Sequence, residues 1–436
     1  MFIFAKKTFL SQVTNNIVLK NANYLFNYTN YLLYTFPIMN KRKIFNDPVY
    51  GFISIPYDIV FDVIEHPYFQ RLRRIQQLGL SSLVYPGATH SRFHHSLGAM
   101  HLMSRSLEVL KSKGHDITEA ESEAAVLAIL LHDLGHGPFS HALEGTLVEN
   151  IHHEHISLLL MKTLQKKYGK PIETAIQIFT GKYPKKFLHQ LISGQLDMDR
   201  MDYLNRDSFY SGVSEGVIGY DRLINMLDVH DDNIVVEEKG IYSVEKFLVA
   251  RRLMYWQVYL HKTSLVADLM LRNTILRAKE VYKNKICNDA ISDNLKFFLT
   301  HSFEEKSFEN EIERFALLDD YDIFQALKMW MHCDDTILQT LSTSIVNRTL
   351  FKIEFLEENA IENKYKLLEI QYNTDEMKYL VLKGSAQNNA YNPNKDNIYI
   401  KFKDGSIKEI TEITEQWNIR SLSNPVVKNY IAYPKK

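Results

Sequence analysis

The stretch LHDLGHGPFSH at 131–141 combines residue types that bind metals with residues that force a tight turn. It places His132 directly before Asp133, at the expected end of an apolar helix. Neighbouring helical residues point about 100° apart, so both can bind one ion only at a helix end or in a relaxed loop. The glycines that follow permit such a loop, and imidazole nitrogen with carboxylate oxygen suits a divalent metal of intermediate hardness. The stretch therefore predicts part of a metal site.

Two residues elsewhere complete the expected ligand set. His95 stands in SRFHHSLG (91–98), near the start of a helix, and Asp199 stands in DMDRMDY (197–203). When a single His-Asp pair lies on a helix, one residue usually packs in the core and the other faces solvent. This loop differs, because it has three histidines and an aspartate separated by glycines. Two imidazoles and two carboxylates leave open positions for water and a phosphate oxygen, which is the arrangement of metal-assisted hydrolysis. Fe, Mn, Ni, Zn or Co fit such a set, with Mg as an additional candidate.

Groups that can transfer protons lie close to these ligands in the sequence. His136 and His141 belong to the same loop, Glu144 follows His141 within one helical turn, and His153 and Glu154 come a little later. Histidines titrate near neutrality and can pass a proton to a departing oxygen. We expect these residues to provide acid–base catalysis.

Three arginines are candidates for phosphate binding, because the planar guanidinium group matches phosphate oxygens. They are Arg92, Arg200 and Arg251, supported by the hydroxyls of Tyr203 and Tyr259. A single arginine is more often a solvated surface charge. Arg92 and Arg200 gain weight because each is close in sequence to an expected metal ligand.

The pattern from about 40 to 280 is helical, with apolar residues at three- and four-residue steps. The expected helical segments are 58–79, 95–113, 119–132, 153–168, 171–180, 184–207, 219–228 and 243–283. This region predicts an α-helical bundle that carries all the candidate catalytic residues.

The character changes after about 360, where 379–383 and 398–403 alternate apolar and polar residues and Asp404-Gly405 is a hairpin signal. We therefore expect a mainly α protein with a small C-terminal α+β appendage. The expected division is an extension at 1–38, a catalytic core at 39–284, and a helical connection with the α+β region at 285–436.

Composition excludes several classes of protein. The formal net charge is -1 and 45% of the residues are hydrophobic, which is typical of a globular protein and gives no sign of a dedicated nucleic-acid surface. Cys287 and Cys333 lack a CxxC pattern and are expected to be reduced, which suits a cytoplasmic location. No stretch reaches the roughly 18 apolar residues that a membrane span needs. Residues 1–38 contain no acids and read as a loosely held or non-native extension.

Seven stretches in the helical region together resemble the HD superfamily of phosphohydrolases, in its deoxynucleoside triphosphate triphosphohydrolase (dGTPase-like) branch. The stretches are FNDPVYG (45–51), HPYFQRLRRIQQLG (66–79), YPGATHSRFHHSLG (85–98), HDLGHGPFSH (132–141), HHEH (152–155), DMDRMDYLNRD (197–207) and RRLMYWQVYLHK (251–262). The resemblance implies an HD-domain helical bundle. It is specific for the fold and the metal site and less specific for the substrate.

The resemblance also assigns roles to single residues. The implied metal ligands are His95, His132, Asp133 and Asp199. The implied catalytic groups are His136 and His153, which polarise the attacking water, and His141, which protonates the leaving group. The positions that match phosphate contacts are Arg92, Arg200, Tyr203, Arg251 and Tyr259. The positions that match the family's contacts to the sugar 3′-hydroxyl are Gln77, Leu78 and Asp207.

Family members release the deoxynucleoside and intact triphosphate, usually as homo-dimers or homo-tetramers, and some need a nucleotide activator. This sequence departs from the family pattern at three positions. Glu144 replaces the common aspartate of the water-activating relay, and Arg200 replaces a lysine. Glu65 stands where some relatives use aspartate to recognise an activating guanine.

Two rival functions stay open at this point. One is an HD phosphatase or phosphodiesterase that acts on another nucleotide. The other is a nucleotide-sensing, nucleic-acid-binding scaffold that retains the metal. Three separated cationic positions favour a triphosphate, because more negative charge needs more counter-charges. The complete ligand and relay set favours an active hydrolase over a scaffold.

Overall fold

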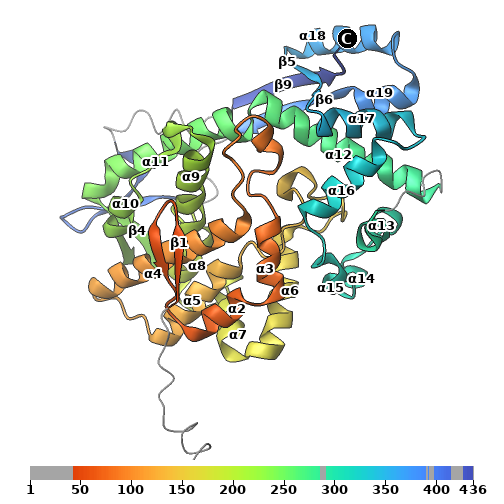
Figure 1. Ribbon diagram of the computed structural model, residues 1–436. Helices are drawn as coiled ribbons and strands as arrows, with labels where there is room; N and C mark the ends of the chain where they lie inside the picture. Colours follow the sequence, from red (N-terminus) through yellow and green to blue (C-terminus); the bar gives the residue numbers. More distant parts are fainter. Residues whose placement is uncertain (1–42, 285–290, 389–390, 392–396, 414–425, 436) are drawn as a thin grey trace, which may run out of the picture. The chain divides into compact units, whose positions relative to one another are not determined.

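The structure of the protein is a computed structural model. It describes residues 43–284, 291–388, 391, 397–413 and 426–435 (Figure 1). The expected extension at 1–38 and Cys287 lie outside these residues, whereas Cys333 is buried. Residues Ile44–Lys436 form one compact unit.

Helices dominate the first part of this unit, as the sequence predicts. Their bounds are α2 Asp58–Ile64, α3 Pro67–Arg71, α4 Arg92–Ser112, α5 Glu119–Leu131, α6 His153–Tyr168, α7 Lys170–Phe179, α8 Lys186–Ser193, α9 Met198–Ser211, α10 Tyr220–Met226, α11 Ile241–Met254 and α12 Lys262–Lys283. Short 3-10 turns are η1 Leu72–Arg74, η2 Gly79–Leu83, η3 Ser140–Ala142, η4 Ser214–Gly216 and η5 Glu238–Gly240. A π-helical turn, η6, covers Tyr255–Tyr259.

Helix α5 is the central helix of this bundle. It begins at Thr118, whose side chain accepts a hydrogen bond from the backbone of Glu121 while the Glu121 side chain accepts one from the backbone of Thr118. Its second half is apolar on every side and fully buried, and it packs against α2, α4, α7 and α8. A helix that is apolar all round lies in a core, and the C-terminal end of this one carries His132 and Asp133.

Three expected helices are broken in the structure. Segment 58–79 ends its first helix at Ile64, because Pro67 cannot continue it and instead begins α3. Segment 184–207 divides at Gly194, after which Asp197 caps α9 by accepting a hydrogen bond from the backbone N–H of Arg200 at 2.7 Å. Segment 243–283 divides at the π-helical turn. Residues 227–228, expected as the end of a helix, belong to a strand.

The strands form three small sheets. The first sheet is a hairpin of β1 (Ile44–Asp47) and β2 (Gly51–Ser54). The second has the strand order β3 (Leu227–His230), β4 (Asn233–Glu237), β7 (Tyr399–Lys401) and β8 (Ile407–Glu409). The third has the order β5 (Lys352–Phe355), β9 (Val426–Tyr433) and β6 (Leu382–Asn388). The expected hairpin at Asp404-Gly405 joins antiparallel β7 and β8, with Gly405 at a positive φ of 85°. Segment 379–383 was expected as a strand, but α19 extends to Leu380, so β6 starts only at Leu382.

The C-terminal region is mixed α and β, as expected, and it also completes the core. Its helices are α13 Asp293–Thr300, α14 Glu305–Glu309, α15 Ile312–Phe315, α16 Asp320–Trp330, α17 Thr336–Val346, α18 Glu358–Glu369 and α19 Thr374–Leu380, with the turn η7 at Ile410–Glu412. Helix α12 packs against the turns η2 and η6. It also packs against β5, α17 and α19 of the C-terminal region (Figure 1). Strand β7 pairs in parallel with β4. Within the described residues, no helix is long and apolar enough to cross a membrane.

Candidate active site

The four expected metal ligands converge from three helices and one loop. His95 comes from α4, His132 caps α5, Asp133 follows it, and Asp199 lies in the first turn of α9. The His95 Nε2 atom is 3.1 Å from Asp199 Oδ1 and 3.4 Å from His132 Nε2. The His132 Nε2 atom is 3.2 Å from Asp133 Oδ1. Ligand atoms about 2.0–2.2 Å from one ion lie roughly 3 Å apart, so this donor set fits a divalent metal.

Hydrogen bonds on the far side of both imidazoles select the atoms that face the metal position. The Nδ1 atom of His95 is 2.7 Å from Asp202 Oδ2, and that of His132 is 2.6 Å from the carbonyl oxygen of Ile129. Both partners are acceptors, so both Nδ1 atoms carry the hydrogen and both Nε2 atoms keep a lone pair. The histidines are therefore oriented as ligands before an ion binds.

Asp202 belongs to a buried ion network that sequence reasoning missed. Arg206, one turn along α9, donates from Nε to Asp202 Oδ2 and from NH2 to Asp202 Oδ1, both at 2.9 Å. It also donates from NH1 to Asp47 Oδ2 at 2.7 Å, which ties the β1–β2 hairpin to α9. A Cβ atom on Gly98 would lie 1.9 Å from Asp202 Oδ1, so only glycine fits there. The four-residue spacing of Asp202 and Arg206 is the sequence signal that could have revealed this pair.

Loss of this arginine should destabilise the fold. Arg206→Met is expected to lower the free energy of unfolding by about 3–5 kcal/mol, because it leaves buried carboxylates without a counter-charge. Urea unfolding followed by circular dichroism measures this. Arg105→Met is the matched control, since its ion pair with Asp221 is exposed and should contribute less than about 1 kcal/mol. Equal losses in the two variants would contradict the assignment.

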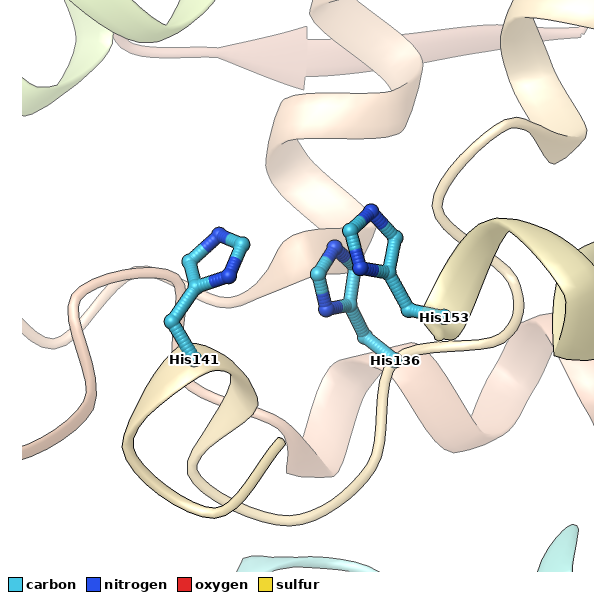
Figure 2. A group of neighbouring side chains, drawn as sticks. All are labelled: His136, His141 and His153. Atoms are coloured by element: carbon cyan, nitrogen blue, oxygen red, sulfur yellow. The ribbon is translucent and has the colours of Figure 1, made fainter. Parts of the chain in front are cut away.

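Three histidines and one glutamate form a second group beside the ligands. Figure 2 shows the rings of His136 and His153 side by side, and they stack at 3.9 Å between centroids. The ring of His141 stands across from them, 5.0 Å from that of His136. Glu144 faces His153 Nδ1 at 2.7 Å and His141 Nδ1 at 3.2 Å. These hydrogen bonds hold the pKa of Glu144 well below its usual range, so its carboxylate stays ionised and orients both rings.

His136 connects this relay to the metal ligands. Its Nε2 atom is 3.3 Å from Asp133 Oδ1. Burial, followed by the nearby guanidinium group of Arg92, lowers the pKa of His136 well below its usual value. A neutral His136 can accept a hydrogen bond from water at a free ring nitrogen. Glu154, by contrast, is exposed on α6 and is not among the described residues that line the cavity.

A cavity of about 460 Å³ opens onto the ligands and the relay, a volume typical of a small-molecule site. It is lined by Gln77, Leu78, Gly79, Ser81, Arg92, Asp133, His136, Phe139, Ser140, His141, Ala142, His153, Asp199, Tyr203, Asp207, Tyr255, Tyr259 and Asp268. Most of the expected catalytic and binding residues are in this set. His95 and His132 lie behind it, almost wholly buried.

Comparison with known proteins places the chain in a family. The HD domain matches residues 92–207, and the HD associated region matches residues 218–298. A phosphohydrolase of Bacteroides thetaiotaomicron with a known crystal structure is 51% identical, and the match covers 91% of this chain and 100% of that one with a TM-score of 0.85. The chain belongs to the HD superfamily of phosphohydrolases. HD domains bind divalent metals, and the group of His95, His132 and Asp199 meets that requirement.

Two further relatives of this HD protein show how far the similarity extends. YwfO, an uncharacterized protein of Bacillus subtilis, is 32% identical over 86% of this chain and 88% of its own length. The deoxynucleoside triphosphate triphosphohydrolase SAMHD1 homolog of Dictyostelium discoideum is 33% identical over 63% of this chain and 57% of its own length. The chain thus matches nearly all of the first relative and little more than half of the second.

The three expected phosphate-binding arginines of the HD protein differ in position. Arg92 lines the cavity, forms an ion pair with Asp133, and donates from Nε to Ser140 Oγ at 2.6 Å. Arg200 forms an ion pair with Asp197 instead. Arg251 donates to Gln195 Oε1 at 3.0 Å. Among the described residues, the cavity lining therefore contains one arginine, whereas the printed contacts of Arg200 and Arg251 are with Asp197 and Gln195.

Asp207, an expected sugar-binding residue, is held by two neighbours. The hydroxyl of Tyr259 donates to its Oδ2 at 2.8 Å, and His90 Nε2 lies 2.8 Å from its Oδ1. The ring of His90 stacks on that of Tyr210 with 4.4 Å between centroids. His90 has no other candidate site residue beside it in the sequence, so no motif pointed to it. It fixes the carboxylate of Asp207 from behind.

Proposed function

We propose that this HD phosphohydrolase is a deoxynucleoside triphosphate triphosphohydrolase, of the dGTP-like kind, that releases the deoxynucleoside and intact triphosphate. One observation carries the proposal: two of the expected metal ligands (Asp133 and Asp199), the three relay histidines and Asp207 border a single cavity of about 460 Å³. One cavity thus offers groups for phosphate, for water activation and for a sugar hydroxyl. The Dictyostelium relative, which carries this activity in its name, supports the same substrate class.

The chain's own residues supply the proton transfers. A divalent metal held by His95, His132, Asp133 and Asp199 would supply Lewis-acid polarisation of the phosphate and would lower the pKa of its water. Glu144 holds hydrogen on the Nδ1 atoms of His153 and His141, which leaves each Nε2 atom toward the reaction. His153 and His136 orient the attacking water toward the α-phosphorus. His141 gives its Nε2 proton to the O5′ oxygen as the bond from phosphorus to that oxygen breaks.

A rival activity keeps one specific observation in its favour. Arg200 and Arg251 pair with Asp197 and Gln195 rather than line the cavity. A monophosphate or a phosphodiester needs fewer counter-charges than a triphosphate, so this arrangement also suits an HD phosphatase or phosphodiesterase on another nucleotide.

Product analysis tests the proposal against this rival. The metal-loaded protein is incubated with each of the four dNTPs, with and without GTP, and the products are separated by anion-exchange chromatography. Deoxynucleoside plus inorganic triphosphate supports the proposal. Pyrophosphate, single phosphate or no product contradicts it and points to the phosphatase, the phosphodiesterase or the nucleotide-sensing, nucleic-acid-binding scaffold. A requirement for GTP would add a nucleotide activator, and light scattering would establish the proposed homo-dimer or homo-tetramer.

Removal of the support behind Asp207 should weaken substrate binding. His90→Phe keeps a ring to stack on Tyr210 but loses the hydrogen bond to Asp207. We expect KM for the preferred dNTP to rise about tenfold, the size of one hydrogen bond to a charged group, with a smaller change in kcat. A 2′,3′-dideoxy substrate should show no such rise. An equal loss with both substrates would contradict the role of His90 in sugar recognition.

A further inference from the structure

One carboxyl group that lines the cavity has an oxygen without a hydrogen-bond partner among the described residues. Asp268, in the second turn of α12, lines the cavity. Its Oδ1 atom is shielded from solvent, and no described residue donates a hydrogen bond to it. Burial raises the pKa of Asp268 to about 7, which reflects the cost of an unpaired buried charge. No role in metal binding or proton transfer accounts for this residue.

A second buried carboxyl nearby shows what a structural role looks like. Asp320 accepts from the backbone N–H of Phe139 at 2.7 Å and from that of Gln76 at 2.8 Å, so both of its oxygens are used. Asp268 Oδ1 and the Phe139 carbonyl oxygen both approach Gly79, since a Cβ atom there would be 3.9 Å from the first and 3.8 Å from the second. Asp320 thus fixes the loop that Asp268 merely borders. A buried acceptor without a donor is expensive unless a ligand supplies one.

The surroundings of Asp268 restrict which part of a nucleotide can supply that donor. A triphosphate offers only negatively charged acceptors, which a carboxylate repels. A nucleoside offers donors in its sugar hydroxyl and in the N–H groups of its base. The side-chain Oε1 atom of Gln77, in the same cavity lining, is a second shielded acceptor without a donor among the described residues. Two such acceptors fit the nucleoside end of the substrate.

We propose that Asp268, together with the amide oxygen of Gln77, forms a subsite that accepts hydrogen bonds from the nucleoside and so sets which nucleoside the cavity prefers. This inference rests on the proposed function, because it takes a deoxynucleoside triphosphate as the ligand. It distinguishes Asp268 from Asp207, whose oxygens already receive hydrogen bonds from Tyr259 and His90.

Substrate discrimination tests the subsite. The values of kcat/KM are measured for the wild type and for Asp268→Ala with dGTP, with dITP, which lacks the base 2-amino group, and with 2′,3′-dideoxy-GTP, which lacks the 3′-hydroxyl. We expect the preference for dGTP over one of the two analogues, taken as kcat/KM for dGTP divided by kcat/KM for that analogue, to fall by about tenfold to a hundredfold in the variant, the range for one hydrogen bond to a charged group. A fall in the preference over dITP assigns the base 2-amino group as the donor, and a fall in the preference over the dideoxy analogue assigns the sugar hydroxyl.

Asp320→Asn is the matched control, because Asp320 is a neighbouring buried carboxyl that holds backbone. It should lower the melting temperature and leave both ratios unchanged. An equal loss of kcat/KM for all three substrates in Asp268→Ala, or no loss at all, would overturn the subsite. If the wild type hydrolyses no dNTP, the proposed function fails by itself. In that case the Kd values of dGTP and of the two analogues are measured by calorimetry with the metal-loaded proteins. The ratios of these Kd values then test the subsite independently of turnover.

Discussion

Asp133→Ala is expected to remove the metal and the activity together. The carboxylate stands 3.2 Å from His132 Nε2 and 3.3 Å from His136 Nε2, so it joins the ligand group to the relay. Its loss deletes one of four donors, and with the ion goes several kcal/mol of transition-state stabilisation, a fall in turnover of about 1,000-fold or more. Metal content by plasma mass spectrometry and turnover of the preferred nucleotide measure the two effects.

The fold should survive this change well enough for both measurements. Asp133→Ala leaves the guanidinium group of Arg92 without its ion pair, so some stability is lost at this buried position. Asp133→Asn keeps the shape and an acceptor for Arg92, and it should separate metal loss from loss of stability. Circular dichroism checks that both variants are folded. Full metal content in a folded, inactive Asp133→Ala would show that Asp133 acts on the proton relay and not as a ligand.

His141→Ala should retain the metal and slow turnover by about a hundredfold or more, the usual contribution of a general acid. The side chain is 70% exposed, so its removal should cost little stability. Its hydrogen bond to Glu144 orients the ring toward the cavity, where it can reach a leaving group.

His152→Ala provides the matched control for this variant. His152 is also exposed, at 83%, and its Nδ1 atom lies 3.6 Å from the same Glu144 oxygen that His153 contacts, yet it is not in the described lining of the cavity. Its removal should change kcat by less than about twofold. Full kcat in His141→Ala, or equal losses in both variants, would exclude His141 as the acid.

The sequence predicted the fold class well because its strongest signals are local. The apolar periodicity of α4 and α6, the run of α5 that begins acidic and ends apolar, and the hairpin turn at Asp404-Gly405 depend only on neighbouring residues. It failed where a local breaker acts inside a periodic stretch, as at Pro67 and Gly194. It also failed at 379–383, where alternation could not distinguish a strand from the end of α19.

The residues of the candidate site were likewise predictable only where the sequence signal is local. Composition and spacing alone named His132, Asp133, His136 and His141, because one tight loop carries them all. Partners that come from distant elements left no such signal. His90 meets Asp207 across 117 positions of the chain, and Arg206 meets Asp47 across 159. A hydrogen bond between such residues depends on helix packing, which a single sequence does not display.

The sequence by itself thus determined which chemistry this protein can carry: a divalent metal, histidines for proton transfer and the HD fold that presents them. Only the tertiary structure decided how those groups are held and what else borders them. It placed Arg200 on Asp197, Arg251 on Gln195, and in the cavity wall Asp268, whose Oδ1 atom has no donor among the described residues. The physical reason is that residue type fixes what a side chain can bind, whereas burial and neighbours fix whether its partners are already taken.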